Sequence, residues 1–246
     1  MNLADNEIHL WWSFERPQDE SALRQMATIL QPKELERVDS AHSSESKLRF
    51  LAARAMQRTV LTKYAPGIDP ASLRFVKGEH GKPILAPGFQ SLRLHFNLTH
   101  TEGLIAIAVS RHRDIGIDAE NLYERTTALQ LARRYFTAEE ARNLDALPPE
   151  RQPARFYSLW TLKESWMKAS GRGISAALDN AAFSLDDQHQ VVGMSFAAYD
   201  AADWRFWQYR PTEEHVLALA LRAPGGTGGV TVATQEWRPD ELTSGA

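Results

Sequence analysis

The chain has 246 residues, of which 43% are hydrophobic, and a formal net charge of −3. This length allows one large domain or two small ones, and the balanced charge offers no basic excess for nucleic acid. The absence of cysteine excludes disulfides, zinc–thiolate sites and cysteine nucleophiles. The start, MNLADNEIHLWW, lacks the basic and apolar regions of a secretory signal, and the apolar runs are too short to span a bilayer. We therefore expect a soluble, cytoplasmic protein that binds neither nucleic acid nor membrane.

Hydrophobic periodicity and turn residues predict a mixture of helices and strands in the first half of the chain. In chain order they are a strand at residues 8–14, short helices at 19–30 and 32–39, a long helix at 44–64, a possible strand at 71–76, a turn-rich loop at 78–88, and strands at 92–98, 104–109 and 114–120. The long helix places Arg49, Arg54 and Arg58 off its apolar face. These arginines are therefore free to face solvent or a ligand.

The second half predicts a similar succession. Helices are expected near residues 126–136, 137–147 and 153–170, followed by strands near 182–185, 191–199, 204–209, 215–222 and 230–237. The order short helix, loop, long helix occurs in both halves. So does a Thr-Glu turn that opens a strand of large apolar residues alternating with alanine, and the matching segments are about 105–111 residues apart. That distance exceeds the 20–50 residues of a solenoid repeat.

The repeat predicts an α+β fold of two similar half-domains related by a pseudo-twofold axis. We expect an N-terminal half at residues 1–113, a C-terminal half at 114–225, and a C-terminal strand and tail at 226–246. The seam between two related halves is a common place for a ligand. The active site is therefore expected at the seam.

The segment DIGIDAE at residues 114–120 brings two carboxylates to one side of a predicted strand. Because side chains alternate, Asp118 and Glu120 share a face with Gly116, and the isoleucines face the core. Two carboxylates at i and i+2 repel each other unless a cation or solvent lies between them. A solvated edge strand is the alternative, but the position at the seam, beside a glycine that leaves room for a ligand, favours a site.

The segment WTLKESWMKASGRG at residues 160–173 predicts a helix with a third carboxylate. Its core face carries Leu162 and Trp166, whereas Glu164 and Lys168 lie in a neighbouring column with Trp160. One reading is an ordinary i,i+4 surface pair. The other is a site: three carboxylates without a histidine or cysteine ligand suit Mg²⁺, or Mn²⁺, which commonly shares a phosphate.

Several basic side chains could receive such phosphates, although each taken singly is most simply a surface charge. They are Arg49, Arg54, Lys82, His100, Lys163 and Lys168. His100 belongs to FNLTH, where Thr99 and other small polar residues flank it at the end of a strand, a common place for site residues. The sequence contains no P-loop, GxGxxG or GxSxG motif.

Three of these motifs together resemble the 4′-phosphopantetheinyl transferases, and the two-half Sfp type in particular. They are FNLTH at 96–100, GIDAE at 116–120 and WTLKESWMKASGRG at 160–173. The family signature is (I/V)G(I/V)DxE followed by WxxKExxxK; GKP at 81–83 and YFTAEEARNL at 135–144 match flanking motifs. The resemblance extends from about residue 47 to 175, and Thr99 stands where serine is frequent in the family.

The resemblance implies a role for each matching residue. Asp118, Glu120 and Glu164 would bind Mg²⁺ together with the pyrophosphate of the substrate, coenzyme A. The expected coenzyme A contacts are His100, Thr99 and Lys168 at the pyrophosphate, Lys163 at the nucleotide, and Lys82 with Arg49 or, alternatively, Arg54 at the adenine end and 3′-phosphate. Glu164, Lys168 and Glu120 are the expected catalytic residues.

The implied reaction moves the 4′-phosphopantetheine arm to a serine of an apo-acyl or peptidyl carrier protein and releases adenosine 3′,5′-bisphosphate. The base that takes the serine proton is either Glu164 or a metal-ordered water. A monomer is expected. Two other hypotheses use the same residues: a Mg²⁺-dependent nucleotide pyrophosphate hydrolase, and a binding module in which the carboxylates form only surface pairs.

Overall fold

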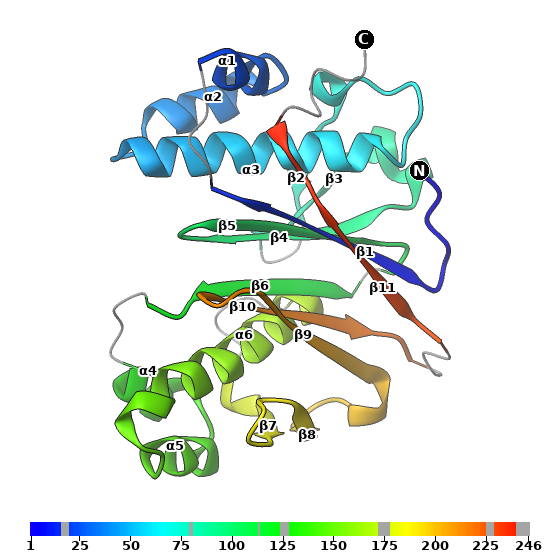
Figure 1. Ribbon diagram of the computed structural model, residues 1–246. Coiled ribbons are helices and arrows are strands. Elements are labelled where there is room, and N and C mark those ends of the chain that lie inside the picture. Colours follow the sequence, from blue (N-terminus) through cyan, green and yellow to red (C-terminus); the bar gives the residue numbers. More distant parts are fainter. Residues whose placement is uncertain are drawn as a thin grey trace.

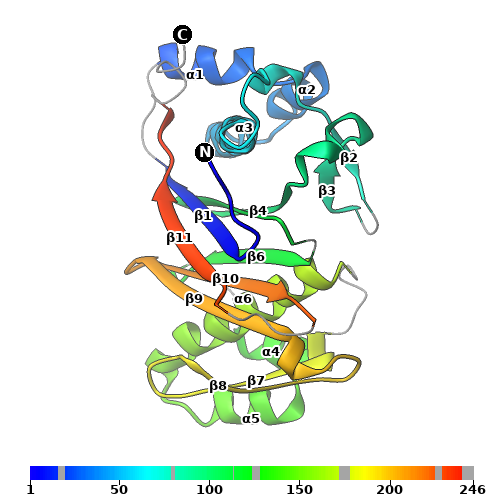
Figure 2. The ribbon, with the colours of Figure 1, turned by 90° about the vertical axis from the view of Figure 1, so that its right-hand side faces the viewer.

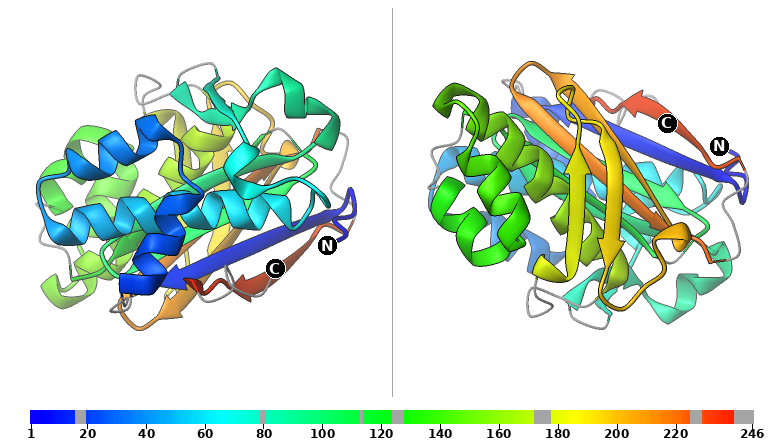
Figure 3. Two further views of the ribbon diagram at one scale, coloured as in Figure 1. Left: turned by 90° about the horizontal axis from the view of Figure 1, so that it is seen from above. Right: turned by 90° about the horizontal axis from the view of Figure 1, so that it is seen from below.

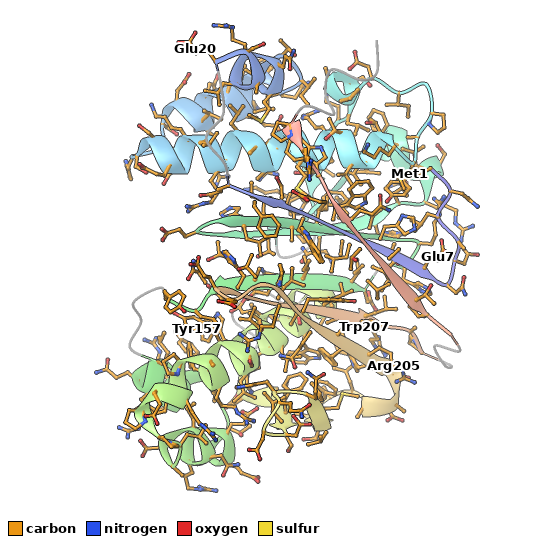
Figure 4. All side chains as sticks on the ribbon, viewed as in Figure 1. Met1, Glu7, Glu20, Tyr157, Arg205 and Trp207 are labelled. Atoms are coloured by element: carbon orange, nitrogen blue, oxygen red, sulfur yellow. The ribbon has the colours of Figure 1, made fainter. Side chains whose placement is uncertain are left out.

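The computed structural model describes residues 1–15, 20–78, 81–112, 114–123, 128–171, 178–224 and 229–239. Its elements form four layers, with helices above a first sheet, a second sheet below it, and further helices at the bottom (Figure 1). Side chains fill the spaces between the layers (Figure 4). Each half of the chain therefore supplies the helices that cover its own sheet, and a strand from the C-terminal end completes the first sheet.

Helices cover the outer faces of both sheets, and one long helix dominates in each half. The helices are α1 (Glu20–Thr28), α2 (Pro32–Asp39), α3 (Ser44–Thr62), α4 (Ala128–Tyr135), α5 (Ala138–Asp145) and α6 (Gln152–Ser170). The Ser43 hydroxyl caps the start of α3 by accepting a hydrogen bond from Ser46 N at 3.1 Å. Helix α6 ends at Gly171, whose φ of 68° is the left-handed conformation that glycine adopts at helix ends.

The first sheet has the order β11 (Thr231–Glu236), β1 (Glu7–Phe14), β5 (Leu104–Ser110), β4 (His95–Thr101), and the second has the order β6 (Ile115–Asn121), β10 (His215–Arg222), β9 (Trp204–Thr212). Two hairpins complete the fold: β2 (Phe75–Lys77) with β3 (Pro83–Leu85), and β7 (Ala181–Leu185) with β8 (Val191–Phe196). The β2–β3 hairpin projects to one side of the upper half (Figure 2). Strand β11 lies parallel to β1, so the end of the chain returns to the first sheet.

The central strands are buried on both faces, and their alternation divides the core. On β5, Ile105 and Ile107 pack toward α3, whereas Ala106 and Ala108 face the second sheet. Seen from above, α3 runs across the strands of the first sheet, and the view from below shows α4 and α5 beside the β7–β8 hairpin (Figure 3). The two sheets thus share an apolar interface, and the β4 edge of the first sheet lies beside the β6 edge of the second.

The predicted α+β fold of two similar halves is confirmed, with local differences. The loop expected at residues 78–88 contains β3, and the strand expected from residue 92 begins at His95, after a 3₁₀ turn that starts at Pro87. Arg58 lies inside the core with 1% of its surface exposed, because Glu34 and two backbone carbonyls bind its guanidinium. No helix in the described ranges is long and apolar enough to cross a membrane.

Candidate active site

The centre of the site is an ion pair within the C-terminal half, which a side chain of the N-terminal half joins. Lys168 on α6 donates a hydrogen bond from Nζ to Oδ1 of Asp118 on β6 at 2.6 Å, and the Thr99 hydroxyl on β4 donates to the same oxygen at 3.3 Å. Lys168 Nζ also lies 3.4 Å from Thr99 Oγ1. Helix α6 and strands β4 and β6 therefore meet at Asp118, at the seam where the active site was expected from the sequence.

Asp118 is strongly desolvated. Only 5% of its surface is exposed, and burial raises the pKa of its carboxyl group, although the Lys168 ammonium opposes that rise. Its second oxygen, Oδ2, is buried and accepts no hydrogen bond from the described residues. A buried carboxylate oxygen without a partner is costly, so this atom marks a position where a cation would be stabilising.

Glu164 lies on α6, one turn before Lys168, and is half-buried. Burial raises the pKa of its carboxyl group to about 7, the negative charge of Asp118 adds to the rise, and Lys168 opposes it. Near neutral pH this side chain is thus divided between its acid and its carboxylate. The negative charge of Asp118 thus acts on the Glu164 carboxyl group.

Glu120 is half-buried and lines the same cavity as Asp118. Within the described part of the chain, however, no three His, Cys, Asp or Glu side chains are gathered in a geometry that could hold a metal ion. The Lys168 ammonium binds Oδ1 of Asp118, so Oδ2 is the oxygen of this carboxylate that a metal could reach. The residue types fit Mg²⁺, since all three are carboxylates and Asp118 Oδ2 lacks a partner.

A cavity of about 290 Å³ opens beside Asp118 and Lys168. Its wall contains six of the predicted site residues, namely Arg54, Thr99, His100, Asp118, Glu120 and Lys168. His100 is exposed at the end of β4, where reduced contact with water and then the cations Arg49, Lys168 and Arg54 lower the pKa of its ring. A cavity with cations on one side and carboxylates on the other suits a phosphate that arrives with a metal ion.

Of the two alternative arginines, Arg54 lines the cavity. Its Nη1 donates to Gln57 Oε1 at 2.6 Å, its guanidinium stacks 5.0 Å from the centre of the Phe50 ring, and burial lowers its pKa. Arg49 instead forms an ion pair with Glu15. Arg49 is still close enough to His100 to affect its pKa, so both arginines contribute positive charge at this end.

Lys82 lines a second, larger cavity of about 820 Å³, which shares Pro83 and Phe96 with the first. Its ammonium donates to the backbone carbonyls of Ile115 at 2.6 Å and Lys168 at 3.2 Å, and so ties the start of β6 to the end of α6. Burial lowers the pKa of Lys82 to about 8, against the attraction of Asp114.

Comparison with known proteins agrees with this geometry. The family model of the 4′-phosphopantetheinyl transferase superfamily matches residues 114–220, and that of the N-terminal part of a 4′-phosphopantetheinyl transferase matches residues 13–112. The 4′-phosphopantetheinyl transferase HetI of Nostoc sp. is 33% identical over 225 residues, which cover 92% of each chain. The chain belongs to the 4′-phosphopantetheinyl transferase family.

Further relatives point the same way. A 4′-phosphopantetheinyl transferase of Bacillus subtilis is 31% identical over 90% of this chain and 95% of its own, and Sfp of the same species is 29% identical over 72% and 76%. The protein is thus a transferase that moves the phosphopantetheine arm of coenzyme A to carrier proteins. Six of the residues predicted for this reaction line the cavity at the seam, and the others, Glu164, Arg49, Lys82 and Lys163, are not among its lining residues.

One predicted contact of the transferase is wrong. Lys163 is 0% exposed, and its ammonium binds Glu140 Oε2 at 2.8 Å, Leu178 O at 3.0 Å and the carbonyl of Ala181. Its three donors are therefore all used inside the C-terminal half, and it reaches neither cavity. Glu140 has a structural role as well, since Oε1 accepts from Phe183 N at 2.9 Å and Oε2 from Thr137 N at 2.8 Å.

A second expectation also needs correction. Gly116 was expected to leave room for a ligand, but a Cβ there would lie 2.1 Å from Ser165 O and 2.4 Å from Ala169 N. The glycine instead lets helix α6 approach strand β6 closely, which brings Lys168 to Asp118. The sequence analysis also missed Gln57 as a lining residue, and only its buried neighbours on α3 could have indicated that it faces inward.

Proposed function

We propose that this transferase is Mg²⁺-dependent and that Asp118, Glu120 and Glu164 hold the metal together with the pyrophosphate of coenzyme A. The observation that carries the proposal is the buried Asp118 carboxylate, whose Oδ2 lacks a partner and whose charge raises the pKa of Glu164 on helix α6. When bound there, Mg²⁺ would neutralise charge on the pyrophosphate and act as a Lewis acid.

The chain's own cations complete the phosphate site. Lys168 is half-exposed to the cavity and can turn from Asp118 to a phosphate oxygen, where it would stabilise the negative charge that grows in the transition state. His100 and Thr99 line the same wall and offer further donors. Arg54 or Arg49, with Lys82, is proposed for the adenine end and 3′-phosphate.

The proposed reaction is a displacement at the β-phosphorus. The serine Oγ of an apo-acyl or peptidyl carrier forms a bond to this phosphorus, and the bond to the bridging oxygen breaks. Adenosine 3′,5′-bisphosphate leaves with the electron pair. The serine proton passes to Glu164 or to an ordered water. We further propose a cytoplasmic monomer with its halves divided at residues 113 and 225.

The test is transfer to purified apo-carrier proteins of the fatty-acid, polyketide and peptide-synthetase classes, scored by the mass gained. The wild type should modify at least one class with Mg²⁺ and none in EDTA. Asp118→Asn and Glu164→Gln should each lower turnover at least about a hundredfold, the effect of losing several kcal/mol of transition-state stabilisation. Full activity in EDTA would overturn the metal assignment. Release of adenosine 3′,5′-bisphosphate without a carrier would favour the hydrolase hypothesis.

A further inference from the structure

Three polar side chains of β4 face the other sheet. Asn97, Thr99 and Thr101 alternate with Phe96 and Leu98, which pack toward the core of the N-terminal half. Their partners across the ladder, Ala108, Ala106 and Leu104, belong to the apolar interface between the sheets. Asn97, Thr99 and Thr101 are all buried. A row of buried polar groups at the rim of an apolar interface needs hydrogen-bond partners there.

The partners are on β6, on both sides of the carboxylates. Asn97 Oδ1 accepts a hydrogen bond from Ile117 N at 2.8 Å, and Thr101 Oγ1 accepts one from Asn121 N at 3.2 Å. Strand β6 is the edge of its sheet, and an edge strand presents N–H groups that its own sheet leaves unpaired. At this seam, two side chains of β4 therefore accept hydrogen bonds from backbone N–H groups of β6, as the carbonyls of a neighbouring strand would within a sheet.

The spacing is the same on both strands. The two acceptors are four residues apart on β4, and the two N–H donors are four residues apart on β6, with Asp118 and Glu120 between them. Between the two bonds, the Thr99 hydroxyl reaches Asp118 directly. The polypeptide that carries both carboxylates is thus held at each end by the strand that carries Thr99 and His100.

We propose that Asn97 and Thr101 are positioning residues of the transferase, which clamp β6 so that Asp118 and Glu120 face the same point in the cavity as Thr99 and His100. In this role they act through the backbone of β6, and Asn97 also lines the cavity. The inference rests on the proposed function, because it assumes that Asp118 and Glu120 are metal ligands.

The test measures Mg²⁺ binding by calorimetry with coenzyme A saturating, after correction for Mg²⁺ binding to free coenzyme A, beside the Mg²⁺ dependence of transfer. Thr101→Val removes the acceptor at nearly constant shape and should weaken Mg²⁺ binding about tenfold, the usual effect of losing a group that orients a metal ligand. Thr101→Ser keeps the hydroxyl and should restore the wild-type value. Asn97→Ala should act like Thr101→Val, and it decides the question if that variant does not fold.

Thr161→Val is the matched control, because Thr161 is also buried but donates only to the carbonyls of Tyr157 and Ser158 in its own helix. It should leave Mg²⁺ affinity unchanged. Wild-type affinity in folded Thr101→Val and Asn97→Ala overturns the clamp, as does equal weakening by Thr101→Ser. Asp118→Asn distinguishes failure of the metal site from failure of the clamp. If this variant binds Mg²⁺ like the wild type, the proposed metal site is wrong. If Asp118→Asn weakens Mg²⁺ binding and the Thr101 and Asn97 variants do not, the metal site stands and only the clamp is wrong.

Discussion

Lys168 Nζ lies 2.6 Å from Oδ1 of Asp118 on strand β6 and pairs with this carboxylate, rather than with Glu164 one turn before it on α6. The i,i+4 pair expected from the sequence is replaced because the two carboxylates differ in burial: Asp118 is 5% exposed, whereas Glu164 is half-buried and retains water. An unpaired charge costs more free energy when it is buried than when it is hydrated. Lys168 therefore serves as the counter-ion of the more desolvated carboxylate.

This pairing predicts how Lys168 affects metal binding. Because the ammonium at Oδ1 and Mg²⁺ at Oδ2 would compete for the charge of one carboxylate, Lys168→Met should bind Mg²⁺ at least about tenfold more tightly than the wild type when coenzyme A is absent. Mg²⁺ should also raise the melting temperature of the variant more than that of the wild type. Calorimetry and thermal unfolding measure the two effects. Lys168→Arg keeps the charge and is the control, and equal Mg²⁺ affinity in all three proteins would contradict the competition.

Glu164 predicts a pH-dependent stability in metal-free buffer. Its pKa is raised to about 7 in the folded protein, so between about pH 4.5 and 7 the folded state holds the proton more tightly than the unfolded state. The stabilising contribution of the protonated Glu164 carboxyl group is therefore fully present below about pH 4.5 and is lost as the pH rises through about 7. Glu164→Gln removes the penalty and should gain up to about 3 kcal/mol over the wild type above pH 7.

Urea unfolding at pH 5 and pH 8 measures this difference. The gain of Glu164→Gln should be clearly larger at pH 8 than at pH 5, and saturating Mg²⁺ with coenzyme A should reduce it by stabilising the wild type. The matched control is Glu139→Gln, a change on α5 for which neither Asp118 nor Lys168 is a neighbour. An equal gain at both pH values would show that the folded protein does not raise the pKa of Glu164.

The sequence predicted the elements that alternate or repeat most regularly. On β6, Ile117 faces the apolar interface and Asp118 faces α6, as the period of two requires. The carboxylates and Lys168 could be assigned to one site because their motifs are matched closely. Which of two arginines faces the cavity could not be predicted, because Arg49 is bound by Glu15, which lies far from it in the chain and outside any local pattern, whereas Arg54 binds Gln57 of its own helix.

Buried charges were the hardest to foresee. Lys163 precedes Glu164 in the motif, and a lysine is almost never fully buried unless it is paired. Its partner Glu140 comes from another helix, and its carbonyl acceptors come from a later segment, so no pattern within α6 shows them. Arg58 with Glu34 is a similar case in the N-terminal half. Such pairs depend on tertiary contacts, which a single sequence does not display.

The close contact between β6 and α6 predicts a strong effect at Gly116. In Gly116→Ala the new methyl group would meet Ser165 O at 2.1 Å and Ala169 N at 2.4 Å, both backbone atoms that cannot rotate away. We expect a loss of about 3 kcal/mol in the free energy of unfolding, the upper part of the range for overpacking. Because α6 must move, Lys168 should also lose its contact with Asp118, and transfer should fall.

Gly88→Ala is the matched control for this change, since nothing lies within 4 Å of a Cβ at that position. It should unfold within about 0.5 kcal/mol of the wild type, as surface substitutions usually do. Denaturant unfolding of both variants gives the comparison. If Gly116→Ala were as stable and as active as Gly88→Ala, the contact between the strand and the helix would not need a glycine.

Lys163 predicts a loss of stability without a loss of affinity for coenzyme A. Lys163→Met leaves Glu140 buried without its cation, which should cost about 3–5 kcal/mol in the free energy of unfolding. The double variant Lys163→Met with Glu140→Gln removes both charges, while the new amide oxygen can still accept from Phe183 N. It should therefore recover part of the loss, and denaturant unfolding of the four proteins measures the coupling.

Coenzyme A binding then separates a structural lysine from a ligand-binding one. The Lys163 ammonium is fully buried, and Glu140 and two backbone carbonyls use its three donors. Folded Lys163→Met should therefore bind coenzyme A within about twofold of the wild type. Lys168→Met loses a charge-assisted contact and should bind coenzyme A about tenfold more weakly. Calorimetry at low temperature keeps both variants folded. A tenfold loss of affinity in Lys163→Met with unchanged stability would return this lysine to the nucleotide site, because only direct contact with the ligand produces that combination.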